Sequence, residues 1–149
     1  MSIHGKKRRH GTSLLFVLCS LLFVSCSLLF STAFLQCAKL TPEQQASLAA
    51  EGYYRHLIAG EYEQFLQGRV GADSLSDDYR EQLLTAYRQF VAQQQEKHNG
   101  IADVTVSNVR TDSLCDYTSV FLLLSFRDST QEEIIVPMVD TGNGRWRMR

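Results

Sequence analysis

The side chains in this sequence that could do chemistry are few and widely spaced. They are four tyrosines, one histidine and one aspartate: Tyr53, Tyr54, His56, Tyr62, Tyr87 and Asp103. A general base needs an orienting partner and a substrate within hydrogen-bond reach. No partner for His56 can be identified, so we interpret it as a helix surface or boundary residue. The tyrosines could line a pocket tipped with hydroxyl groups, although aromatic residues at helical spacing more often face a core. We predict no catalytic residue.

Metal and cofactor motifs are absent from the sequence. A zinc site needs three or four His, Cys or carboxylate ligands at recognisable spacing, and no such cluster or Cys-x-x-Cys pair occurs. Cys115 is the single cysteine after residue 38, so no internal disulfide is expected in the part of the chain that follows. We therefore predict neither a metal nor a cofactor.

The charge of the 149-residue chain, formally −1, is unevenly distributed. Residues 1–13 form a basic tail that contains Lys6, Lys7, Arg8 and Arg9, and residues 14–38 carry no charged side chain. The remaining 11 of the 15 basic residues accompany all 16 acidic residues, a net charge of −5 for residues 39–149. A mildly acidic domain without a basic stripe argues against a nucleic-acid partner.

The uncharged segment 14–38 predicts a membrane anchor, because roughly 20 apolar residues are enough to cross a bilayer as a helix. The basic tail places the N-terminus in the cytoplasm and residues 39–149 outside it. Two alternatives remain open: lipid attachment at Cys26 after signal cleavage, or a cleaved secretory signal that ends near Ala33. All three interpretations predict a domain outside the cytoplasm, and the first predicts the inner membrane as its location.

The domain is expected to contain three helices followed by four strands. Helix start and stop signals indicate helices from Thr41 to Gly60, from Glu61 to Gln67 and from Ser76 to Asn99, with a loop over residues 71–74. Alternating apolar residues indicate strands at 101–110, 119–126 and 134–139, and a last strand with Trp146 and Met148. This order predicts an α+β fold in which the helices pack on one face of a curved antiparallel sheet.

Two features of the predicted strands refine this expectation. The strand 119–126 is apolar at both alternating sets of positions, which is typical of a central strand. Glu132 and Glu133 on one strand, and Arg145, Arg147 and Arg149 on the next, are expected to form cross-strand charge pairs.

The pattern resembles the nuclear transport factor 2-like superfamily over nearly all of residues 41–149. The resemblance rests on residues 50–66, which are similar to the family's first helix, glycine break and second helix. It also rests on Val136-Pro137-Met138-Val139 with Asn143-Gly144-Arg145-Trp146, which resembles the family's last hairpin. The resemblance implies a cone of helices closed on a bent sheet, in which the six residues named first are candidate pocket residues. It also implies kinship with small exported or membrane-anchored bacterial domains.

Fold alone does not define function in such a family, and two hypotheses follow. The first is a non-catalytic, membrane-tethered binding or scaffold domain of the bacterial cell envelope, whose partners are a small hydrophobic ligand or an envelope protein. Such a domain could also form a homodimer through its sheet face. The alternative is a small isomerase- or dehydratase-like enzyme with a polar pocket inside the cone.

Overall fold

A computed structural model of the chain describes residues 39–111, 116–142 and 144–149. The predicted tail 1–13, the predicted anchor 14–38 with Cys26, and Cys115 lie outside the described residues. Within the described part of the chain, no helix is long and apolar enough to cross a membrane. Residues 40–149 form one compact unit.

The helices begin and end where their capping residues predict. Helix α2, Pro42–Ile58, starts with a capping box in which the Thr41 and Gln44 side chains each accept a hydrogen bond from the other residue's backbone N–H. Helix α3 follows at Tyr62–Gln67, after Gly60 at a φ of +79°. The predicted loop 71–74 contains a short 3-10 turn, η1, at Ala72–Ser74.

Helix α4, Asp77–His98, is capped by the Ser76 side chain. Asn99 ends it in the left-handed conformation, with a φ of 59°. The three predicted helices are therefore confirmed, with boundaries within two residues of those read from the capping signals.

The four strands form one antiparallel sheet in the order β1-β2-β3-β4. Their bounds are Ile101–Thr111, Thr118–Phe126, Gln131–Asp140 and Trp146–Met148. The sheet and the helices confirm the predicted α+β class, with three helices packed on a four-stranded antiparallel sheet. Strand β4 is short and pairs with residues 138–140 of β3. In this register Met138 lies opposite Met148, and Asp140 lies opposite Trp146.

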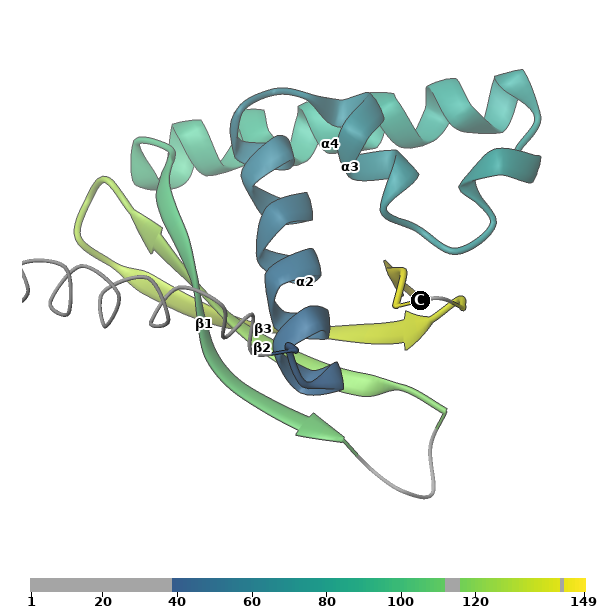
Figure 1. The fold of residues 1–149 in the computed structure, drawn as a ribbon. Coiled ribbons are helices and arrows are strands. Elements are labelled where there is room, and N and C mark those ends of the chain that lie inside the picture. The colour runs from purple at the N-terminus through teal and green to yellow at the C-terminus, as the bar shows by residue number, and fades with distance from the viewer. Residues whose placement is uncertain (1–38, 112–115, 143) are drawn as a thin grey trace, which may run out of the picture. The chain divides into compact units, whose positions relative to one another are not determined.

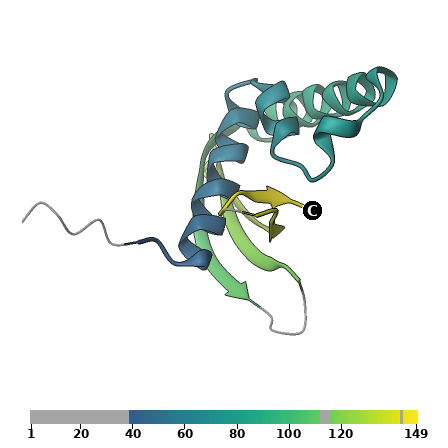
Figure 2. The same cartoon turned by 45° about the vertical axis from the view of Figure 1, so that its right-hand side comes forward.

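The core lies between α2 and one face of the sheet, and Figures 1 and 2 show α2 crossing that face. Ala46 and Ala50 of α2 are fully buried, and so are Val120 and Leu122 of β2. The small alanine side chains let the helix approach the sheet closely. Every second residue of β2 is buried and the residues between them are half-buried, as expected for a central strand.

The end of α4 is tied to the turn between β2 and β3. The His98 Nδ1 and Asp128 Oδ2 atoms are 2.8 Å apart, and the Asp128 backbone N–H donates to the His98 carbonyl. The His98 ring stacks on Phe126 with a centroid distance of 4.3 Å. Figure 1 shows the resulting arrangement, in which α4 extends along one end of the sheet.

The predicted charge pairing between β3 and β4 is wrong. Strand β4 ends before it reaches the part of β3 that holds Glu132 and Glu133. Glu133 instead accepts a hydrogen bond of 2.7 Å from Ser107 of β1, on the sheet face opposite the core. Arg147 forms an ion pair of 2.9 Å with Asp73 of η1.

Candidate functional site

A cavity of about 470 Å³ opens between α2, α3, α4 and the inner face of β3. Its apolar lining includes Leu57, Phe65, Phe90, Leu124, Ile134 and Val136. Alternation along β3 and its register with β2 place Ile134 and Val136 on the same sheet face as the core. The volume falls in the range that small-molecule sites occupy in proteins, and such sites are mostly apolar with a few polar groups.

Three aromatic rings form one wall of the cavity. Phe65 of α3 packs edge to face between Tyr54 of α2 and Tyr87 of α4, with centroid distances of 5.3 and 4.8 Å. Such pairs contribute about 0.5–1.5 kcal/mol each beyond the area that they bury. The wall is therefore held in place by contacts among three helices.

The hydroxyl groups of this wall are in an unusual environment. Burial raises the pKa of Tyr54 above its usual value, the nearby Tyr87 raises it further, and the positive charge of Arg69 opposes the increase. The Tyr87 hydroxyl oxygen is buried and has no hydrogen-bond partner among the described residues. Because an unpaired buried hydroxyl costs about 1–3 kcal/mol, a ligand atom that bonded to it would recover part of this cost.

Charged groups lie at both ends of the cavity. Arg69 and Arg149 line it near β4, and Glu132 and Gln94 line it near the other end of β3. None of the three charged side chains forms an ion pair within the described part of the chain. Glu132 and Arg149 were predicted to take part in cross-strand charge pairs, and Arg69 and Gln94 were not among the candidate pocket residues.

Of the six candidate pocket residues, Tyr54 and Tyr87 line the cavity. Tyr53 is adjacent to Tyr54 in sequence but packs elsewhere: its hydroxyl donates to the Trp146 carbonyl over 2.9 Å. Its ring rests on Gly68, where a Cβ atom would lie 2.5 Å from the ring, so only glycine fits at that position. Tyr62 packs against the core, with the Arg88 guanidinium 6.0 Å from its ring centroid.

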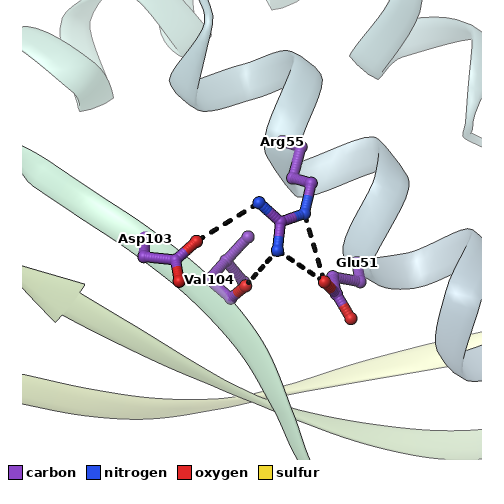
Figure 3. A network of polar contacts seen from close by, with 4 residues as sticks. All are labelled: Glu51, Arg55, Asp103 and Val104. Atoms are coloured by element: carbon purple, nitrogen blue, oxygen red, sulfur yellow. Dashed lines mark hydrogen bonds and ion pairs between the residues drawn. The ribbon is translucent and has the colours of Figure 1, made fainter.

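His56 and Asp103 do not line the cavity. The His56 Nδ1 atom lies within hydrogen-bond distance of the Glu61 carboxylate, and its side chain is 42% exposed. Asp103 lies on β1 and pairs with Arg55 over 3.3 Å, as Figure 3 shows. Arg55 also bonds Glu51 and the Val104 carbonyl, so this network ties α2 to β1.

Among the described residues, no group of three or more His, Cys, Asp or Glu side chains is arranged to hold a metal ion. The cavity contributes two phenols, two guanidinium groups, an amide and a carboxylate. This combination can hold an apolar body and hydrogen-bond or ion-pair with polar groups at its ends.

Three helices thus lie on one face of a four-stranded antiparallel sheet, with a cavity between them and the sheet. A solved structure with this fold is the crystal structure, at 2.00 Å resolution, of a protein from Campylobacter jejuni that is named provisionally as an NTF2-like transpeptidase. The two superpose with a TM-score of 0.53 and 13% sequence identity, over 66% of this chain and 92% of the other. This likeness shows the fold alone. No protein-family model and no curated protein sequence matches the chain.

Proposed function

We propose that this protein is a non-catalytic binding domain tethered at the outer side of the bacterial inner membrane. The observation that carries the binding part is the preformed cavity with an aromatic wall and the unpartnered Tyr87 hydroxyl. The uncharged segment 14–38 after a basic tail supports the tether and its orientation.

We favour binding over the alternative of an isomerase- or dehydratase-like enzyme because of where the acid–base candidates lie. His56 and Asp103 are outside the cavity lining, and each is held by a charged neighbour on the surface. Tyr54 lines the cavity, but a tyrosine hydroxyl ordinarily keeps its proton at neutral pH, and burial raises the pKa of Tyr54 further. A hydrogen-bond donor of this kind suits recognition of a ligand better than proton abstraction from one.

The proposal that the cavity binds a ligand is tested by introducing a tryptophan inside the cavity and, as a control, another outside it. Ile134→Trp introduces a large ring on the inner face of β3 within the cavity. Phe121→Trp introduces the same ring on β2 at a half-buried position of the opposite sheet face, and Phe121 itself does not line the cavity. Both variants of the full chain would be placed in lipid nanodiscs and screened with water-soluble fragments by ligand-observed NMR.

We expect several fragments to bind the unmodified chain at one site, to lose binding at least about tenfold in Ile134→Trp, and to bind Phe121→Trp normally. A tenfold loss corresponds to about 1.4 kcal/mol. Circular dichroism melting would check that both variants fold. Fragments that bind all three proteins equally would show that the cavity is not the binding site and would refute the proposal.

A further inference from the structure

Within the described residues, one edge of strand β3 has no neighbouring strand over half its length. Strand β2 covers one edge of β3 from residue 131 to 138. On the other edge, β4 pairs with residues 138–140 and Arg149 bonds to Pro137. Among the described residues, none pairs with β3 from Gln131 to Val136 on that second edge. An open edge of this kind presents unpaired N–H and C=O groups that can hydrogen-bond to another extended chain.

The residues that face the open edge follow from the hydrogen bonds of β3. The Arg149 N–H donates to the Pro137 carbonyl over 2.9 Å, so Pro137 faces the β4 side of the strand. In an antiparallel ladder the N–H and C=O of one residue face the same side, and successive residues alternate. The backbone groups of Ile135 and Glu133 therefore face the open edge. The Ile135 side chain is 60% exposed, so this edge also carries an accessible apolar group.

The cavity lies directly beside this open edge. Its lining includes Glu132 and the β3 residues from Ile134 to Pro137, so it follows β3 over about 17 Å at roughly 3.4 Å per residue. Side chains of a strand alternate between its two faces, so every second residue of an added strand would point toward the cavity. There it would meet Tyr54, Tyr87 and Phe90.

The charges at the two ends of the cavity indicate where a bound molecule would carry charges of opposite sign. Arg149 and Arg69 lie at the end near Pro137, and Glu132 lies at the other end. A peptide with an acidic residue at the first end and a basic residue at the second would complement both. A small apolar ligand would use the cavity but would leave the edge amides without hydrogen-bond partners and the charged ends without ionic partners.

We infer that the occupant of this site is an extended peptide segment of a partner protein, which adds a strand to β3 beside Gln131–Val136. The segment carries apolar side chains at alternate positions and opposite charges at its ends. Main-chain bonds to Ile135 and Glu133 supply affinity, and the cavity selects the side chains, as in other cases of strand addition. The inference rests on the proposed binding function and specifies the chemical class of the partner.

The test uses the full chain in lipid nanodiscs and a phage library of random nine-residue peptides. Enriched peptides would be synthesised and their affinities measured for the unmodified chain, Ile135→Pro and Ile135→Ala. Proline removes the N–H that faces the open edge, whereas alanine keeps it and removes only the side chain. We expect about tenfold weaker binding to Ile135→Pro and about threefold or less to Ile135→Ala, as loss of a main-chain hydrogen bond predicts.

A second experiment modifies the peptide and leaves the protein unchanged. N-methylation of the peptide amides that face β3 should weaken binding about tenfold, and hydrogen exchange at Ile135 and Glu133 should slow when the unmethylated peptide is bound. Strand addition is refuted if no peptide is enriched, or if the enriched peptides tolerate both N-methylation and Ile135→Pro. If fragment binding is nevertheless lost in Ile134→Trp, the proposed function stands without the strand. If that binding is also retained, both proposals are refuted.

Discussion

Asp128 shows how one side chain fixes the end of helix α4 against the sheet. Its carboxylate accepts hydrogen bonds from the side chain and the backbone N–H of Thr130 and lies 2.8 Å from His98 Nδ1. The Thr130 hydroxyl, the Thr130 backbone N–H and then His98 lower its pKa to about 2. Since the ordinary value is about 3.9, the charged form stabilises the folded state.

This lowered pKa predicts how stability depends on pH. A carboxyl group whose pKa falls on folding contributes stability above its unfolded pKa, and this contribution is lost as pH falls through the folded value. We expect Asp128→Asn to be less stable than the unmodified chain at pH 7, and the difference to disappear between about pH 4 and pH 2. Thr130→Val should reproduce part of the loss. Denaturant unfolding at a series of pH values measures it, and a difference that persists unchanged at pH 2 would contradict the account.

At the residue scale, the helix caps could be predicted from residue type, but the cavity-lining tyrosine could not. The caps at Thr41, Ser76 and Asn99 are encoded by short local patterns, and the structure has all three as expected. The choice between Tyr53 and Tyr54 could not be made in this way. They are sequence neighbours about 100° apart on one helix. The ring of Tyr53 packs on Gly68, whereas the ring of Tyr54 packs on Phe65 of α3 in the cavity wall, and these contacts are known only from the fold.

Among the elements, β4 could be located from the sequence, but the extent of its pairing with β3 could not. Alternating residues located this strand correctly, and the hairpin turn fixed its register with β3. Pattern alone does not state how far along β3 the pairing continues. The predicted charge pairs assumed that it reached Glu132 and Glu133. Within the described residues this pairing is absent, which leaves the edge of β3 open and Glu132 without a cross-strand cation.

The N-terminal segment gives a prediction at the element scale. If residues 14–38 anchor the chain with its basic tail inside, alkaline phosphatase fused after Arg149 should be active in bacteria, and green fluorescent protein fused there should not fluoresce. Replacing Lys6, Lys7, Arg8 and Arg9 by glutamine should weaken this orientation. A fluorescent fusion of the unmodified chain would place the domain in the cytoplasm and contradict the proposed location.

At the scale of the whole domain, the α+β class could be predicted because each element carries its own periodicity and the elements follow in a simple order. The cavity could not be predicted, because α2, α3, α4 and β3 each contribute only a few of its residues. Its volume depends on how far α4 stands from the inner face of β3, and no local pattern reports that distance. The positions of Arg69 and Glu132 in one site likewise emerge only from the folded arrangement.

The central claim is that the cavity holds a ligand, and native mass spectrometry of the full chain purified from bacterial membranes tests it most directly. We predict an additional mass that is released on denaturation, is lost in Ile134→Trp and is retained in Phe121→Trp. Sequencing or fragmentation of the released material would then show whether it is a peptide or a small amphipathic molecule. A chain that carries no additional mass, or a mass that Ile134→Trp retains in full, would contradict the account.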